Sequence, residues 1–431
     1  MSIVIENAAL KNNALAYIED TIEAVPALVE LRTAAAEKFA STDFPSINHE
    51  EWKYTNLKKL VSSTFNFNAS ASVTAEDLEK YLIDGTDVLV FVNGIFNNNL
   101  SKYTSTDKVI VAPLAKAINE HTDLVTAHLG KYADSDLPFV GVNTAAITDG
   151  VFVYAKRNAL SETPVTILNV IIGENTVVQP RLLAVLEEGA QVSIIERNAV
   201  IGNQNVLINS VSEINVAERA ILNHVKLQDE EDNTNLVTLT EAKQADNSVY
   251  HNITITTGGQ LVRNNLNIAL GEHCEGLMTG LYLLKGKTLV DNHTVVDHRM
   301  PNSYSNELYK GILSEKSKAV FNGKIFVRED AQKTNAFQSN KNILLSPDAV
   351  VNTKPQLEIW ADDVSCSHGC TVGALDEEPM FYLRARGISE DKARALLTYA
   401  FAGDVIEKIS NESVRSIVER IVANEMGYPL D

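Results

Sequence analysis

Cysteine, basic residues and long apolar runs are all scarce in this chain of 431 residues. Three cysteines cannot build a disulfide framework for a protein of this length, so a reducing compartment is expected. No run of about 18 apolar residues is present, which argues against a membrane-spanning helix. The N-terminus has early acids and no basic start before an apolar run, so we expect no secretory signal. These absences predict a soluble, cytoplasmic protein.

Basic residues are outnumbered, because 37 Lys and Arg face 56 Asp and Glu and leave a formal net charge of −19. A protein that binds nucleic acid needs a basic face for phosphates, and anionic membranes attract basic surfaces. We therefore expect neither nucleic acid nor a membrane as a partner. Hydrophobic residues make up 45% of the chain, enough for a large core spread over two or three domains.

Residues 1–160 predict a helical and mixed α/β region. Apolar residues three and four apart indicate helix within the first forty residues. The segment "TDVLVFVNGIF" (86–96) predicts a strand that ends in the hairpin turn signal Asn93-Gly94. Further helix is expected between Pro113 and Leu129.

Residues 161–373 consist of short β-rich runs separated by polar turns, with little helical periodicity. Most gaps between the small residues that follow a glycine or a charged turn are about 14 to 18 residues, or near multiples of that length. Repetition at a short fixed period is typical of stacked rungs, so we predict a mainly β fold with a parallel β-helix (solenoid) core. The alternative is an ordinary β protein whose turns have irregular spacing. The recurring small residues are Ala190, Ala220, Gly259, Cys274, Ser317, Ala331, Ala349 and Cys366.

Residues 374–431 predict a C-terminal helical region. Asp376 and Ser389 are suited to cap helices, because acids follow each of them where the helix dipole favours negative charge. Gly427 is suited to end the last helix. The two expected apolar faces comprise Ala393, Leu396, Leu397, Ala400 and Phe401, and then Val414, Ile417, Val418, Ile421 and Val422.

Two segments imitate catalytic motifs. "GLYLLKGKT" (280–288) ends like a phosphate-binding loop but has five residues between its glycines, so we expect a buried strand and no nucleotide site on this chain. "VDNHTVVDHRMPNS" (290–303) places His293 and Asp297 on one face of a strand and His298 on the other, which favours structural contacts over a catalytic or metal site. Amides that we interpret as bridges between rungs are Asn322, Asn335, Gln338, Asn340 and Asn342.

The segment "DVSCSHGCTVG" (363–373) holds two of the three cysteines and a histidine. Thiolates and imidazoles are ligands for zinc and iron. On a strand, Cys366, His368 and Cys370 point to one face, which presents three such groups together. Free cysteines are also common as buried small residues, so metal chemistry and ordinary packing both remain open at this point. A tetrahedral site would still lack one ligand.

Several long blocks resemble the SufB/SufD family of iron–sulfur cluster assembly proteins. These blocks are "EWKYTNL", "ELYKGIL", "VFNGKIFVREDAQKTNAFQSNKNILLS", "NTKPQLEIWADDVSCSHG" and "DEEPMFYLRARGIS". The resemblance implies a right-handed parallel β-helix flanked by helical regions. Within the family the chain is most similar to the SufD branch, because Ala349 stands where the SufB scaffold carries a cysteine and "CSHG" stands where SufB has a His-Glu pair.

The resemblance also implies site residues and partners. Cys366 and His368 would lie at the contact with SufB, where iron or a nascent, transient iron–sulfur cluster is held, whereas Cys370 departs from the family pattern. The chain would be a non-catalytic subunit of a complex with SufB and the ATPase SufC, with a homodimer of the isolated chain left open. SufC would dock on the C-terminal helices through Leu396, Leu397 and Phe401.

Two other classes of function compete with this interpretation. Many parallel β-helices act on polysaccharides, but such enzymes use paired carboxylates or basic residues in an open groove, and no such pair stands out in this sequence. The third candidate is a purely structural scaffold without metal chemistry. Anaerobic reconstitution with iron and sulfide, followed by visible absorbance, would separate cluster assembly from both.

Overall fold

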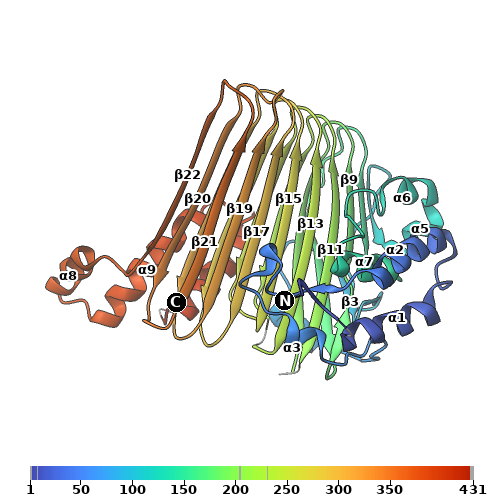
Figure 1. The fold of residues 1–431 in the computed structure, drawn as a ribbon, viewed down its shortest axis with the longest axis horizontal. Coiled ribbons are helices and arrows are strands. Elements are labelled where there is room, and N and C mark those ends of the chain that lie inside the picture. Colours follow the sequence, from blue (N-terminus) through green and yellow to red (C-terminus); the bar gives the residue numbers. More distant parts are fainter. Residues whose placement is uncertain (1, 7, 203–204, 231, 428–431) are drawn as a thin grey trace.

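The chain forms a long stack of parallel strands with helices on its two sides (Figure 1). A computed structural model describes residues 2–6, 8–202, 205–230 and 232–427. Within these residues the strands form two ten-stranded sheets and one two-stranded sheet. The predicted mainly β fold is confirmed as a parallel β-solenoid of about 8 turns, with an N-terminal α/β region and C-terminal helices.

The first sheet contains, in spatial order, β22 (Ser365–Gly373), β20 (Asn335–Leu344), β18 (Tyr304–Leu313), β16 (Glu275–Leu284), β14 (Val249–Thr256), β12 (Ile221–Gln228), β10 (Gln191–Ile201), β7 (Val165–Ile172), β3 (Asp87–Val92) and β4 (Ile95–Phe96). The second sheet contains β21 (Val350–Ile359), β19 (Lys318–Val327), β17 (Leu289–His298), β15 (Leu261–Leu270), β13 (Thr234–Gln244), β11 (Val206–Val216), β9 (Arg181–Leu186), β6 (Val151–Ala155) and β5 (Val109–Pro113), and β8 (Thr176–Val178) pairs with β11. The two-stranded sheet joins β1 (Val4–Ile5) to β2 (Phe44–Pro45).

Along most of the stack each strand pairs in parallel with the strand two places further along the chain, so one turn of the solenoid contains two strands. Gln191 pairs with Ile221, Ile221 with Val249, and Val249 with Glu275. One turn is therefore about 26 to 32 residues long across the stack. The spacing of about 14 to 18 residues found in the sequence corresponds to one strand with its turn, which is half a rung.

The turns at one end of the strands share a local pattern, in which a residue with positive φ precedes a small buried residue. The positive-φ residues are Gly189, Arg219, Asn247, His273, Asn302 and Lys333, with φ between +54° and +69°. Each residue that follows is at most 1% exposed, and these are Ala190, Ala220, Ser248, Cys274, Ser303 and Thr334. The turn places this side chain between the sheets, where little room is left. Cys366 was expected among the turn residues but lies within β22.

The N-terminal region covers the outer face of the second sheet, and its hydrophobic core includes Val177, Leu207 and Val237 from that sheet. The expected hairpin is confirmed, since β3 and β4 are antiparallel around Asn93 and Gly94. Strands β3, β5 and β6, which precede residue 161, extend both sheets of the stack. The helices are α1 (Ala9–Thr21), α2 (Val29–Ser41), α3 (Lys58–Val61), α4 (Ala75–Leu78), α5 (Leu114–Glu120), α6 (Thr122–His128) and α7 (Pro138–Ala145), with 3-10 turns η1 (Pro26–Leu28), η2 (Glu50–Trp52) and η3 (Glu79–Tyr81).

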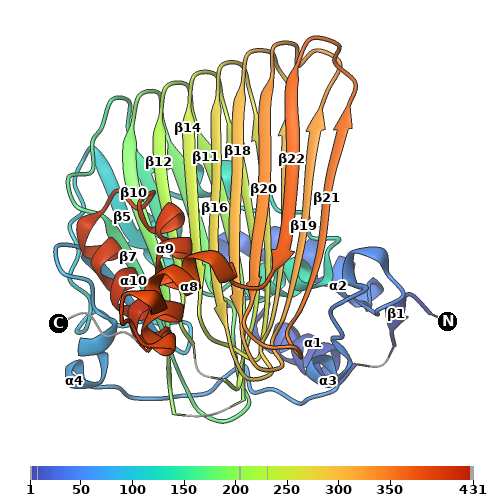
Figure 2. The same cartoon turned by 90° about the vertical axis from the view of Figure 1, so that its left-hand side faces the viewer.

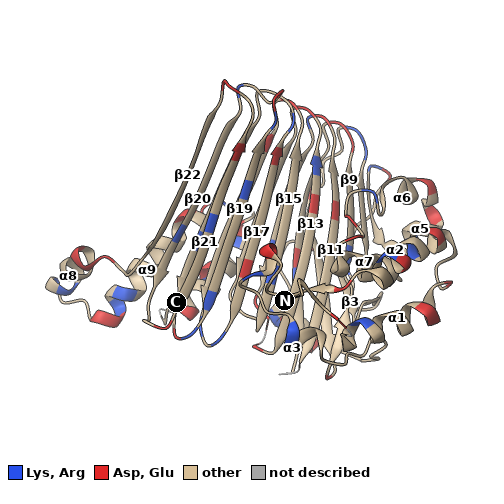
Figure 3. Ribbon diagram, viewed as in Figure 1, with Lys and Arg blue, Asp and Glu red and all other residues tan. Residues whose placement is uncertain are grey.

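The C-terminal helices α9 (Glu390–Ile406) and α10 (Glu412–Glu425) lie on the outer face of the first sheet (Figure 2). Helix α8 (Glu377–Ala385) contacts α9 and projects beyond β22 (Figure 1). Their predicted caps are confirmed: the Asp376 side chain accepts the backbone N–H of Glu378, and that of Ser389 accepts the N–H of Lys392. Charged residues lie mostly on helices and turns, while the strands are mostly uncharged (Figure 3). Among the helices that the structure describes, none is long and apolar enough to cross a bilayer.

Candidate functional site

The last rung of the solenoid carries Cys366, His368 and Cys370 on β22. Their partners in register on β20 are Ala336, Gln338 and Asn340. These partners are buried between the two sheets, so the three side chains of β22 also point toward the interior of the stack. The prediction that Cys366, His368 and Cys370 share one face of a strand is confirmed.

This rung forms an open end of the stack. Strands β22 and β21 stand last in their sheets, and no strand of the described residues covers them. Cys366 and Cys370 are therefore only half-buried, and His368 is exposed. The outer edges of β21 and β22 keep unpaired backbone groups, and such edges can pair with a strand of another chain.

The three side chains of this rung differ in their surroundings. Burial raises the pKa of the Cys366 thiol, so a metal that binds it has to displace its proton. The sulfur of Cys370 lies 2.9 Å from the hydroxyl of Thr353 on β21. Among the described residues, the side chain of His368 has no hydrogen bond or ion pair.

The rung does not by itself form a metal centre. Within the part of the chain that the structure describes, no group of three or more His, Cys, Asp or Glu side chains is placed to hold a metal ion. Residues two apart on a strand are separated by about 6.5–7 Å, so three of them in a row cannot surround one ion. Iron or a cluster at this rung needs further ligands from outside the chain.

A buried polar network lies directly beneath this rung. The Gln338 amide donates from Nε2 to Glu307 Oε2 (3.1 Å), and the Thr294 hydroxyl donates to the same oxygen (2.7 Å). Further along the inward face of β20, Asn340 donates to the Tyr282 hydroxyl (2.9 Å) and Asn342 donates to Asn340 Oδ1 (2.8 Å). The prediction that these amides bridge rungs is confirmed for Gln338, Asn340 and Asn342, since Asn342 accepts the Tyr282 hydroxyl of β16 and donates to the Thr371 carbonyl of β22. The other two have local or outward contacts, because Asn322 donates to Glu51 and Asn335 donates to the Lys333 carbonyl.

His293, Asp297 and His298 do not form one site. His298 points inward, where its Nε2 lies 2.8 Å from the Ser305 hydroxyl. Asp297 points outward and accepts hydrogen bonds from the side chains of Arg299 and Arg328. The expected split over two strand faces is therefore confirmed.

The segment "GLYLLKGKT" lies in β16 and in the turn that leads to β17. Its residues Leu281 to Leu284 are buried in strand conformation. The expected buried strand is therefore confirmed.

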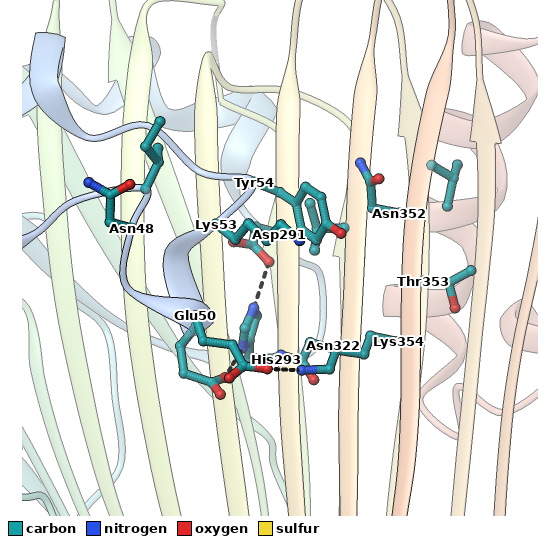
Figure 4. A pocket seen from close by; sticks show the side chains of 14 residues that line it. Asn48, Glu50, Lys53, Tyr54, Asp291, His293, Asn322, Asn352, Thr353 and Lys354 are labelled. Carbon is teal, nitrogen blue, oxygen red and sulfur yellow. Dashed lines mark hydrogen bonds and ion pairs between the residues drawn. The ribbon is translucent and has the colours of Figure 1, made fainter. Parts of the chain in front are cut away.

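A cavity of about 770 Å³ lies on the outer face of the second sheet, beneath residues 47–54 (Figure 4). His293 stands at its centre, with Nδ1 3.3 Å from Glu51 and Nε2 3.0 Å from Asp291. The carboxylates of Glu51 and Glu50 also pair with Lys324 (2.6 Å) and Lys354 (2.5 Å).

These ion pairs join a loop near residue 50 to strands 240 to 300 residues later in the chain. Arg263 is stacked over Trp52 at 4.2 Å and binds Asp291, which also accepts the hydroxyl of Thr55. The arrangement is suited to hold the N-terminal region against the solenoid. Sequence reasoning missed this role of Glu51 and His293, although "EWKYTNL" was one of the blocks that carried the family resemblance.

Helix α9 buries the expected face only at Ala393 and otherwise buries a different one. Its buried side chains toward the solenoid include Thr398, Ala402 and Val405, whereas Ala400 is exposed. Leu396 and Leu397 are half-buried. Phe401 is also half-buried, packs beside the core under the helices and lies against Lys310 at 4.4 Å. The face expected on α10 is confirmed in part, with Val414, Val418 and Val422 buried and Ile417 and Ile421 half-buried.

Comparison with known proteins identifies the family. Residues 169–401 match the family model described as "SUF system FeS cluster assembly, SufBD core domain", and residues 9–167 match "SufBD protein N-terminal region". An iron–sulfur cluster assembly SufBD family protein of Synechocystis sp. is 33% identical and covers 97% of this chain and 94% of its own. The iron–sulfur cluster assembly protein SufD of Escherichia coli is 30% identical over 89% of each chain, and that of Bacillus subtilis is 24% identical over 92% and 94%. The chain therefore belongs to the SufBD family of iron–sulfur cluster assembly proteins.

Proposed function

We propose that the chain is a SufD-like, non-catalytic subunit of a cytoplasmic complex with a SufB-like scaffold and a SufC-like ATPase. In this complex the chain helps to acquire iron and to assemble clusters de novo at its interface with the scaffold. The cluster is cargo that rests there transiently and is shared with the scaffold.

The observation that carries this proposal is the open last rung. Cys366 and His368 point toward the interior of a stack whose end has unpaired strand edges. A partner that extends the stack would cover both residues and could supply the ligands that this chain lacks.

The proposed docking of the ATPase concerns the C-terminal helices on the outer side of the first sheet, away from the inward-facing Cys366 and His368. Helix α8 exposes Phe381 (74%) and Tyr382 (54%), and Leu397 on α9 is half-buried. Large exposed apolar side chains of this kind are typical of surfaces that bind another protein. We retain Leu396, Leu397 and Phe401 as the proposed docking residues, with the covered side of Phe401 serving the chain's own fold.

The test is cluster assembly by the complete complex, reconstituted anaerobically with iron and sulfide and followed by visible absorbance. We expect His368→Ala to lower the yield of cluster and to leave the assembly of the subunits intact, because the imidazole is exposed and forms no hydrogen bond or ion pair within the described residues. Cys366→Ser should have a comparable or smaller effect, and Cys370→Ala little effect.

His121→Ala is the matched control. His121 precedes α6, and its imidazole forms no capping hydrogen bond with that helix, so the variant removes an imidazole far from the last rung. A normal rate and yield of cluster with His368→Ala would show that His368 has no part in assembly. A complex that builds no cluster with the unaltered chain, but hydrolyses ATP and stays associated, would favour a purely structural scaffold.

A further inference from the structure

The polar interior of the solenoid leads in register to His368. On the inward face of the first sheet, Glu307 of β18 pairs with Gln338 of β20, and Gln338 pairs with His368 of β22. Neighbouring strands lie about 4.8 Å apart, so side chains in one such column reach each other. Glu307 is fully buried and Gln338 is 3% exposed, whereas His368 lies at the open end.

The hydrogen bonds in this column determine how the Gln338 amide is oriented. Its Nε2 donates to Glu307 Oε2, which also accepts from Thr294 and so acts as an acceptor whether the carboxyl group is ionised or carries its proton on Oε1. The amide nitrogen therefore faces Glu307, and flipping the amide would set two acceptor oxygens against each other. Gly323 on the facing strand leaves room for this arrangement, because a Cβ there would come within 2.3 Å of Gln338 Nε2.

The other half of the amide is unused. Gln338 Oε1 is buried and has no hydrogen-bond partner among the described residues. Buried acceptors nearly always have a donor, so this oxygen marks an incomplete contact. The next side chain in the column is His368, which also has no partner within the described chain. An exposed imidazole changes its rotamer freely.

We propose that Gln338 is a positioning residue for His368: its Oε1 accepts one ring N–H of His368, which leaves the other ring nitrogen unprotonated and directed to the open end as a ligand. Histidines that bind metals commonly donate their second ring N–H to such an acceptor, which fixes the tautomer and the ring orientation. Glu307 and Thr294 hold the amide in place from below. This inference rests on the proposed function of His368 only for its consequence in cluster assembly.

The first test measures the tautomer of His368 in the isolated chain by nitrogen NMR of labelled histidine, with His368→Gln to assign its signals. Gln338→Met replaces the amide with an apolar side chain of similar length. We expect one tautomer to be enriched in the unaltered chain and its proportion to change with Gln338→Met. Equal tautomer populations in the two proteins would overturn the proposal.

A double variant, Glu307→Gln with Gln338→Glu, keeps the same bonds in reverse order. The new amide at 307 donates to the new carboxylate at 338, whose second oxygen still accepts from His368. We expect this variant to restore the tautomer, which a merely structural role of Gln338 would not do. It also keeps the test decisive if Gln338→Met fails to fold. A folded double variant with the Gln338→Met tautomer pattern would count against the proposal.

Cluster assembly separates this inference from the proposed function. With Gln338→Met we expect the amount of cluster assembled by the complete complex to fall about 10-fold or more. This is the effect typical of residues that orient a metal ligand. A changed tautomer with a normal yield would support the positioning of His368 and contradict its role in assembly. A lower cluster yield with an unchanged tautomer of His368 would overturn the positioning role of Gln338.

Discussion

Buried carboxyl groups show most clearly how a single residue responds to its surroundings in this protein. Burial raises the pKa of Glu307 to about 7, since only the neutral groups of Thr294 and Gln338 donate to it. Glu213 is buried as well, but Arg181 and three backbone N–H groups outweigh the burial, and the pKa of Glu213 is lowered. The same side chain therefore resists ionisation in the interior of the first sheet and favours it at the N-terminal end.

The first residue-scale prediction concerns pH and Glu307→Gln. A pKa of about 7 in the folded state exceeds the value of about 4.3 in an unfolded chain, so Glu307 stabilises the fold below about pH 4.3 and this contribution is lost as the pH rises through 7. The glutamine does not ionise. We therefore compare the free energy of unfolding of Glu307→Gln with that of the unaltered chain. The difference between the two should change by about 2–3 kcal/mol from pH 5 to pH 8, in favour of the variant.

Denaturant unfolding at both pH values measures this shift. Glu329→Gln is the control, because Glu329 is exposed and its replacement should leave the difference between the two pH values unchanged. A pH-independent difference between Glu307→Gln and the unaltered chain would show that Glu307 is ionised in the fold at pH 5 already.

At the scale of elements, the turn decides how strands are stacked. A positive φ at the residue before each small residue reverses the chain within a few residues, and the small side chain then enters the narrow space between the sheets. Arg219 and Ala220 form one such turn between β11 and β12. The requirement is for small volume, because Ala, Ser, Cys and Thr all occupy this position in different rungs.

Ala220→Leu tests this requirement. Ala220 is 0% exposed, so three added carbon atoms must displace neighbouring side chains, and we expect a loss of about 1–3 kcal/mol of stability. The midpoint of thermal or denaturant unfolding measures the loss. Arg219→Gly is the control at the adjacent position; it relieves the left-handed backbone strain and should be neutral or slightly stabilising. If Ala220→Leu is as stable as the unaltered chain, the turn has spare volume.

On the scale of the whole molecule, the two ends of the stack differ. At the N-terminal end, β4 and β5 pair antiparallel with β3 and β6 and so end the parallel series. At the other end, β21 and β22 keep free edges within the described residues. The N-terminal region covers the second sheet and the C-terminal helices cover the first, so the open end remains accessible between them.

The prediction at this scale is that the proposed docking of a SufC-like ATPase can be lost without loss of the solenoid. Leu397→Asp adds a charge to a half-buried position of α9, a helix that packs outside the stack. We expect the ATPase no longer to co-purify, while the circular dichroism of the strands stays unchanged. Ser416→Asp on the exposed side of α10 is the matched control and should retain the ATPase. If the ATPase still co-purifies with Leu397→Asp, the docking surface lies elsewhere.

Local patterns in the sequence by themselves determined several features of this protein. The recurrence of small residues indicated a stack of rungs, and the alternation of side chains on a strand placed Cys366, His368 and Cys370 on one face. Helix caps at Asp376 and Ser389 were equally visible, because capping involves residues at most three apart.

Other features depended on the tertiary structure, since they involve residues far apart in the chain. The length of a turn set which residues share a column, so only the register could bring Glu307 and Gln338 beneath His368. Likewise, Glu51 meets His293 because the N-terminal region lies against the second sheet. The buried face of α9 was decided by the sheet on which it packs, because a helix with apolar residues on several sides can bury more than one of them.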